Sequence, residues 1–145
     1  MFKHLLVPVD GSDTARQAVD KATGLAKAFG SSVTVVYVID PYPFTGLGND
    51  FAYGQAEYLD AASTEATQAT QAAQQALEQA GVSSQAIVME AHATWRGILE
   101  TAQKVGADLI VMGSHGRRGM EKLMLGSTAQ RVLSHSNLPV FVVRD

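Results

Sequence analysis

Glycine and serine residues in the C-terminal third of the chain have the types and spacing that suit a phosphate ligand. Gly113 and Gly116 follow an apolar run that starts at Asp108, and Gly126-Ser127 comes after nine further residues. Glycine lets the backbone approach a ligand closely, and unpaired backbone N–H groups at a helix start bind anions. Two glycine turns on either side of a short excursion can clasp a polyphosphate from both sides. The spacing therefore indicates a nucleotide-binding site.

The same residues also have a purely structural interpretation. Gly113 and Gly116 can shape a tight turn between a strand and a helix, while Ser127 and Gln130 match the capping box S-x-x-Q. Capping and phosphate binding are compatible, because several N–H groups at a helix start are unpaired. We favour binding of phosphate and ribose by backbone N–H groups and the hydroxyl of Ser127.

Charged residues near these glycines leave two questions open. Asp10 ends the first apolar run; it can accept hydrogen bonds from ribose hydroxyls or meet a Mg²⁺ ion brought by phosphates, or it can cap a turn. We favour the ligand role. Arg117, Arg118 and Lys122 lie between the two glycine steps, where they either neutralise phosphate or form a solvated surface. We favour neither interpretation for this basic group.

Motifs for other kinds of chemistry are missing from the sequence. It has no G-x-x-x-x-G-K-[ST], and Gly46-Leu-Gly48 lacks the third glycine of a dinucleotide fingerprint. The chain has no cysteine, which excludes disulfides and thiolate sites, and its histidines form no H-E-x-x-H pattern. Ser114 next to His115 is no evidence of a catalytic pair, since neighbouring side chains rarely converge. We therefore expect neither metal nor nucleophilic catalysis.

Composition predicts one globular domain over residues 1–145. Hydrophobic residues make up 46% and charged residues 17%, and this length suits a single buried core. The formal net charge of −3 argues against nucleic acid as the main partner. The N-terminus lacks the pattern of a signal peptide, and no apolar run approaches the roughly 20 residues that cross a bilayer. We expect a cytoplasmic protein that does not insert into membranes.

Alternating strands and helices must position residues 113–116, which we call the glycine loop. Apolar and β-branched runs predict strands at 4–9, 32–39, 85–91, 107–112 and 139–143. Helical spacing of apolar residues predicts helices at 13–29, 58–80, 94–105 and 127–135. Ser12 is the expected N-cap of the first helix, and Gly30 its stop. This alternation indicates an α/β fold with five parallel strands and helices on both faces.

Such sheets bind ligands beyond the carboxyl ends of their strands, where the strand order reverses. Asp10, Asp40, Glu90 and Gly113 all fall at strand ends of this kind. A phosphoacceptor receiver domain shares the fold type, but it needs an acidic pair, an Asp and a Lys where this chain offers Asp10, Glu90 and Arg144. We reject that alternative. The glycine loop therefore lies on the side where the fold would place a nucleotide.

The sequence resembles the universal stress protein family. The resemblance rests on LLVPVDGS (5–12), VVYVID (35–40) and the long segment 106–143, and it spans essentially the whole chain. ATP-binding members of that family carry G-x2-G-x9-G-[S/T], a pattern that Gly113, Gly116 and Gly126-Ser127 satisfy. One departure is His92-Ala-Thr-Trp95, where many relatives have a Gly-x-Pro turn. The chain is thus similar to the ATP-binding subgroup.

The resemblance implies an open, Rossmann-like sheet in the order 3-2-1-4-5, with the site between the first and fourth strands. It implies that Asp10 and Gly113 contact ribose and that Pro8 and the backbone of Val38 flank adenine. It also implies that the phosphates contact Gly116, Gly126, Ser127 and Thr128. Met112 is a further expected site residue. The expected ligand is ATP with Mg²⁺.

The function that follows is a nucleotide-dependent regulator in the stress response, acting on a regulatory protein partner that the sequence does not identify. Nucleotide would have to favour one conformation or assembly over another. The alternative is a slow ATPase or phosphotransferase of the same fold, although no positioned general base is recognisable.

Two expectations concern surfaces. Strand 139–143 would be a sheet edge, nearly uncharged and apolar, so we expect a homodimer through antiparallel pairing of this strand, or a pair of such dimers. The aromatic-rich segment 42–58 is either a loop packed on itself or a lid or partner surface, and we favour the loop.

Overall fold

Five parallel strands form one sheet in the order β3-β2-β1-β4-β5. The computed structural model describes residues 1–41, 48–116 and 124–144. Its strands are β1 (His4–Pro8), β2 (Ser32–Ile39), β3 (Ser84–Glu90), β4 (Leu109–Gly113) and β5 (Val140–Val143). At the centre, Leu6 of β1 pairs with Thr34 of β2 on one side and Ile110 of β4 on the other. The predicted α/β class and strand order are confirmed.

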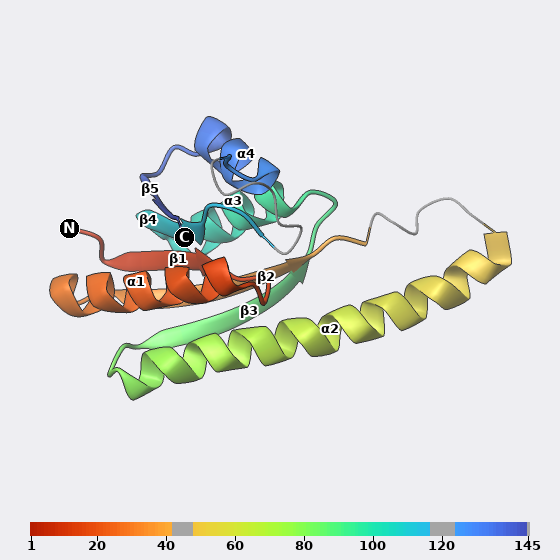
Figure 1. Cartoon of the computed structure of the whole chain (residues 1–145), viewed down its shortest axis with the longest axis horizontal. Helices are drawn as coiled ribbons and strands as arrows, with labels where there is room; N and C mark the ends of the chain where they lie inside the picture. Colours follow the sequence, from red (N-terminus) through yellow and green to blue (C-terminus); the bar gives the residue numbers. More distant parts are fainter. Residues whose placement is uncertain (42–47, 117–123, 145) are drawn as a thin grey trace.

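Helices cover both faces of the sheet, also as predicted. Helices α1 (Asp13–Phe29) and α2 (Gly48–Gln79) lie on one face, and α3 (Thr94–Val105) and α4 (Ser127–His135) lie on the other (Figure 1). Side chains alternate between the faces along each strand, so each face has its own core. Leu5 and Val7 of β1 point towards α1 and α2, whereas Leu6 points towards α3 and α4. Double coverage explains why β1 and β2 read as continuous apolar runs.

The first helix has the capping residues that the sequence predicted. The hydroxyl of Ser12 accepts a hydrogen bond from the N–H of Ala15 at 3.2 Å. Gly30 ends the helix with φ of 68°, a left-handed conformation that favours glycine. Four of the six residues that α1 buries are alanine, so the helix backbone lies close to the sheet. This close approach brings the N-terminus of α1 to the carboxyl ends of β1 and β4.

The second helix begins earlier than predicted, and the loop expected before residue 58 is wrong for residues 48–57. The helix runs from Gly48 to Gln79, whereas the sequence predicted 58–80. Glycine and aromatic residues suggested a break, but a single glycine within a helix costs only about 1 kcal/mol relative to alanine. A helix already formed over later residues extends easily through such a position. Residues 42–47 lie outside the described part of the chain.

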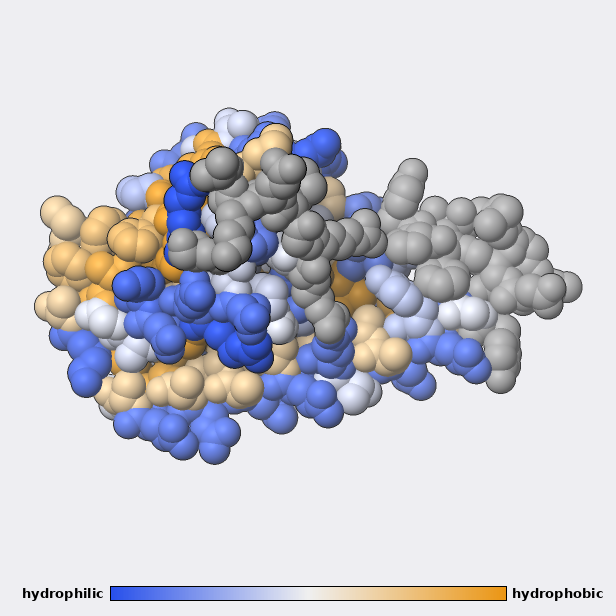
Figure 2. Space-filling view, viewed as in Figure 1, coloured by the Kyte–Doolittle hydropathy of each residue, from blue (hydrophilic) through white to orange (hydrophobic). Residues whose placement is uncertain are grey.

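The sheet holds α2 mainly through its C-terminal half. The side chains that α2 buries there are Ala66, Thr70, Ala73 and Leu77. The first turns of α2 extend past the end of the sheet (Figure 1). Along the later part of α2, hydrophilic residues cover much of the side that faces away from the sheet (Figure 2). No helix in the described ranges is both long and apolar enough to cross a membrane.

A polar cluster lies at the amino end of the sheet, far from the glycine loop. The two ring nitrogens of His4 lie 2.6 Å from the hydroxyl oxygens of Ser32 and Thr34. Burial lowers the pKa of His4 below 6.5, although the nearby Asp108 carboxylate opposes this change. Burial raises the pKa of Asp108, but backbone N–H groups that donate to its carboxylate, including those of Lys3 and His4, bring that pKa below 3.8.

We expect acidification from about pH 7.5 to about pH 5.5 to destabilise the fold partly through His4. Its pKa is lower in the folded chain than in the unfolded chain, so its contribution is complete above the unfolded pKa. That contribution is lost as the pH falls towards the folded pKa. Asp108 does not titrate in this window, because its pKa lies below 3.8. Urea unfolding at the two pH values should show a smaller loss for His4→Gln than for wild type; equal losses would contradict the assignment.

Candidate functional site

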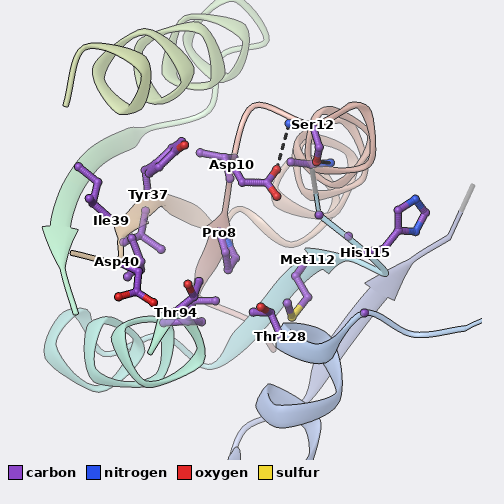
Figure 3. Close-up of a pocket in the computed structure, with 18 of the residues that line it drawn as sticks. Pro8, Asp10, Ser12, Tyr37, Ile39, Asp40, Thr94, Met112, His115 and Thr128 are labelled. Carbon is purple, nitrogen blue, oxygen red and sulfur yellow. Dashed lines mark hydrogen bonds between the residues drawn. The ribbon is translucent and has the colours of Figure 1, made fainter. Parts of the chain in front are cut away.

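A cavity of about 800 Å³ opens above the carboxyl ends of β1, β2 and β4 (Figure 3). The starts of α1, α3 and α4 surround it, and the middle of α2 forms one wall. All nine site residues predicted from the sequence line this cavity: Pro8, Asp10, Val38, Met112, Gly113, Gly116, Gly126, Ser127 and Thr128. They come from β1, β2, β4, the glycine loop and α4. The fold thus brings together in one place residues that are more than 100 positions apart in sequence.

The start of α4 differs from the predicted capping box. Gly126, not Ser127, is the N-cap, and the side chain of Gln130 donates to the carbonyl of Leu125 at 2.7 Å. The N–H of Gly126 donates to the carbonyl of Ser114 at 2.7 Å, which holds the N-cap against the glycine loop. Among the described residues, no side chain caps this helix. The capping-box prediction was therefore wrong by one residue.

This helix start can receive an anion. The first backbone bond of α4 joins the N–H of Gln130 to the carbonyl of Gly126, so the N–H groups of residues 127–129 precede it. Ser127, Thr128 and Ala129 line the cavity. Free N–H groups and the positive end of a helix dipole favour phosphate at such a position.

Two of the site glycines are required by packing between chain segments. A Cβ added at Gly113 would lie 2.9 Å from Cβ of Thr14 on α1. A Cβ at Gly126 would lie 3.1 Å from Cα of His115 and 3.2 Å from the carbonyl oxygen of Ser114. Neither glycine has a positive φ. Close approach between segments of the protein explains both residues, a structural role different from the tight turn at Gly113 and Gly116 considered from the sequence.

Gly116 makes a different contact. A methyl group added there would collide with one carboxylate oxygen of Asp10, Oδ2. The other oxygen, Oδ1, accepts a hydrogen bond from the N–H of Ser12 at 3.0 Å (Figure 3). Asp10 therefore has the turn-capping role considered from the sequence, and it also faces the glycine loop inside the cavity. One oxygen is engaged with the turn while the carboxylate lines the site.

Ser114 and His115 converge, which the sequence did not suggest. The hydroxyl of Ser114 lies 3.1 Å from Nδ1 of His115, and Nε2 of that ring lies 3.5 Å from the hydroxyl of Thr14. Ser114 is only 2% exposed, so its hydroxyl lacks the access that a nucleophile needs. The pair links the glycine loop to the start of α1.

Far from the glycine loop, the cavity has apolar walls and two polar side chains. Val36, Val38 and Ile98 supply apolar surface there. Asp40, at the end of β2, and Thr94, the first residue of α3, lie together on the side of the cavity away from His115 (Figure 3). An apolar slot with a polar corner suits a flat heterocycle.

The sequence departure at 92–95 meets this end of the cavity. Thr94 lines the cavity, while Trp95 turns away and stacks on His135 of α4, with ring centroids 4.2 Å apart. The N-cap of α3, Ala93, makes no side-chain capping bond. A turn that differs from the Gly-x-Pro of many relatives thus shapes the rim of the site.

The wall formed by α2 was missed from the sequence. Tyr58 and Glu65 line the cavity from α2, together with Ala61 and Ala62. The hydroxyl of Tyr58 donates to the backbone carbonyl of Asp40 at 3.2 Å, and that of Tyr37 lies 3.4 Å from Oε2 of Glu65. The apolar stripe of α2 could have indicated which face meets the sheet. It could not indicate how far along the helix the cavity would lie.

Carboxylates are the charged side chains that can be placed around the cavity in the described part of the chain. The basic residues Arg117, Arg118 and Lys122 fall outside the described ranges. Within those ranges, the carboxylates that line the cavity are Asp10, Asp40 and Glu65. No three potential ligand side chains cluster into a metal site in the described part of the chain. The described groups that suit phosphate are backbone N–H groups and the hydroxyls of Ser127 and Thr128.

Comparison with known proteins identifies the family. A profile of the Universal stress protein family matches residues 1–144. Universal stress protein MJ0531 of Methanocaldococcus jannaschii is 36% identical over 145 residues, covering 99% of this chain and 83% of the relative. The structure of the protein MJ0577 of the same organism superposes with a TM-score of 0.89 at 28% identity, covering 100% of this chain and 97% of that one.

Some structures of this fold hold nucleotides. One universal stress protein is in complex with cAMP, at 24% identity and a TM-score of 0.68, with 99% of this chain and 97% of that chain covered. Another, from Archaeoglobus fulgidus, is in complex with dAMP, at 22% identity and a TM-score of 0.72, with 99% and 98% covered. At these identities the likeness establishes a shared fold. Together with the family profile and the relatives above, it shows that this chain belongs to the universal stress protein family.

Proposed function

We propose that the protein binds ATP and acts as a nucleotide-dependent regulator in the stress response. The observation that carries the proposal is the convergence of nine sequence-predicted residues on one cavity at the carboxyl ends of β1, β2 and β4. This is where open parallel sheets bind ligands, at the position between β1 and β4 where strand order reverses. Adenine nucleotides in other proteins of this fold support the ligand class.

The cavity offers a separate environment for each part of ATP. Phosphates would lie at the start of α4, against Gly116, Gly126 and two further residues, Ser127 and Thr128. Ribose would lie beside Asp10, just after β1, and Gly113, the last residue of β4, because these two strands are neighbours in the sheet. Adenine would extend into the apolar slot of Pro8, Val38 and Met112.

Mg²⁺ would enter with the phosphates. The described residues supply no ready cage of three ligands, whereas Mg²⁺ typically binds nucleotide phosphates, waters and one or two carboxylates. Asp10 is the carboxylate in the best position to join it, because its side chain faces the glycine loop. The ion would then offset phosphate charge in a cavity whose described lining includes three carboxylates, Asp10, Asp40 and Glu65.

Regulation requires that ATP favour one state of the protein. A ligand shifts a conformational equilibrium only by the difference between its affinities for the two states. The chain segments around the site, β4, the glycine loop and α4, also border the sheet edge at β5. Nucleotide bound there can bias contacts with another protein chain, which is the output we propose.

Mass spectrometry of native, undialysed protein is the decisive test. We expect ATP, ADP or AMP to co-purify, and calorimetry on the stripped protein to show Mg²⁺-ATP binding. His4→Gln is a suitable control variant, because His4 lies at the opposite end of the sheet and should leave affinity unchanged. If stripped wild type gives no binding signal with Mg²⁺-ATP, the proposed function is wrong.

The homodimer expected through 139–143 stays a prediction, and the structure indicates which substitution tests it best. β5 is a sheet edge and Phe141 on it is 43% exposed. Val140 packs against the core below α3 and α4, so changing it would also disturb the fold. We expect Phe141→Lys to convert a dimer into monomer in light scattering at about micromolar concentration. Val88→Lys, at a 41% exposed position on the other edge strand, should stay dimeric; a monomeric wild type would contradict the prediction.

A further inference from the structure

We propose that Asp40 selects the nucleobase by accepting a hydrogen bond from its exocyclic amino group. The inference rests on the proposed function, because it concerns the far end of the same cavity. It assigns a role to a residue that lay outside the predicted site. Asp40 would be a specificity-determining residue rather than a general ligand contact.

The layout of the cavity orients a nucleotide. The N–H groups of residues 127–129 provide the described anion site, so the phosphates belong at the start of α4. A nucleotide extended from there must place its base on the opposite side of the cavity. Figure 3 shows Asp40 and Thr94 on that opposite side, with Pro8 between them and Met112.

The chemistry of this end distinguishes between base edges. Its walls are apolar, through Val36, Val38 and Ile98, so hydrogen bonds made there are shielded from solvent. An ionised carboxylate can only accept hydrogen bonds, whereas the hydroxyl of Thr94 can donate or accept. Asp40 therefore favours a base that presents a donor, such as the amino group of adenine, and Thr94 discriminates little.

Neighbouring bonds hold Asp40 in place. The hydroxyl of Tyr58 on α2 donates to its backbone carbonyl at 3.2 Å. On the preceding residue, the carbonyl of Ile39 accepts from the N–H of Ala91 at 3.0 Å, which extends the pairing of β2 with β3. Both bonds fix the backbone at the end of β2, so the Asp40 side chain starts from a defined position on the cavity wall and can discriminate by position as well as by charge. Tyr58 is then a positioning residue, acting through Asp40.

The test compares ATP with purine riboside triphosphate, which differs only by replacing the amino group with hydrogen. We expect wild type to bind ATP at least about tenfold more tightly in calorimetry, as for loss of a hydrogen bond to a charged group. Asp40→Ala should reduce this preference to less than about threefold, and Asp40→Asn should give an intermediate value, because a neutral oxygen is a weaker acceptor. Tyr58→Phe should also lower the preference in part.

Glu65→Gln is the matched control. It removes a second carboxylate from the same cavity, but one on the α2 wall beside Tyr37. Asp40→Asn and Glu65→Gln each remove a negative charge that repels the phosphates, so each can raise the affinities for ATP and for the analogue alike. Only the substitution of Asp40 should change the ratio of these two affinities. Melting curves of each variant verify folding, and Asp40→Asn provides a nearly isosteric change.

The outcomes separate the two proposals. If wild type binds ATP but shows no preference over the analogue, or if Asp40→Ala keeps the full preference, the role of Asp40 is overturned while nucleotide binding stands. If wild type binds neither nucleotide, the proposed function fails and this inference fails with it. A preference that falls equally in Glu65→Gln would assign it to general charge and likewise overturn the inference.

Discussion

Gly116→Ala is expected to weaken ATP binding by about tenfold or more while changing the free energy of unfolding by less than about 1 kcal/mol. The added methyl group meets Oδ2 of Asp10, which is the end of a side chain, so the strain is relieved by moving the carboxylate. Gly116 is exposed and has no positive φ, so the backbone accepts alanine. The displaced Asp10 would lose its place beside the ribose and its bond to Ser12.

A double-mutant cycle makes this prediction specific. If the methyl group acts through the carboxylate, Gly116→Ala should have much less effect in an Asp10→Ala background than in wild type. Calorimetry gives the four affinities and thermal melting gives the four stabilities. Equal losses of affinity in both backgrounds would show that Gly116 acts independently of Asp10, by leaving room for the ligand or by contacting it through the backbone.

Local signals in the sequence were sufficient for most of the fold. Helix α1 begins after Ser12 and ends before Gly30, as predicted, because capping depends on residues within one turn of the helix end. β2 reads as a strand from its β-branched residues and has the predicted bounds, Ser32–Ile39. Parallel topology followed from the alternation of elements, which leaves few arrangements.

The candidate site was predictable because of where parallel strands end. Asp10 and Gly113 follow different strands, yet parallel direction places both at the same edge of the sheet. The strand order came from the resemblance to the family, and it was needed to make β1 and β4 neighbours. Without it, these residues could have been separated by another strand.

The errors arose where a short window of sequence does not decide the structure. Residues 48–57 are helical because the rest of α2 propagates through them, which a count of glycine and aromatic residues does not reveal. The N-cap of α4 is Gly126 because its N–H bonds to Ser114 in the glycine loop, a contact that spacing alone cannot show. Tyr58 and Glu65 line the site because of how α2 crosses the sheet. The first of these facts depends on the whole length of α2, and the other two depend on contacts between different segments of the chain.

The second large effect concerns Gly113, and it differs in kind from that of Gly116. Gly113→Val is expected to destabilise the protein by about 1–3 kcal/mol, as overpacking does in a close-packed core. A Cβ at this position would lie 2.9 Å from both Cβ and Cγ2 of Thr14 and 3.1 Å from its backbone carbonyl carbon. Thr14 is 3% exposed, so its side chain has little space to rotate away and α1 itself would have to shift.

Urea unfolding of four proteins tests this explanation: wild type, Gly113→Val, Thr14→Gly and the double variant. Thr14→Gly alone should destabilise the protein, because glycine is unfavourable in a helix. In the Gly113→Val background the same change should cost less, or even stabilise, because it removes two of the three close atoms. A Gly113→Val variant with wild-type stability but no ATP binding would mean that this glycine mainly leaves room for the ligand. If Gly113→Val loses stability and Thr14→Gly partly restores it, then the main role of Gly113 is to let α1 dock against β4. That docking positions Asp10 and the start of α1 at the cavity.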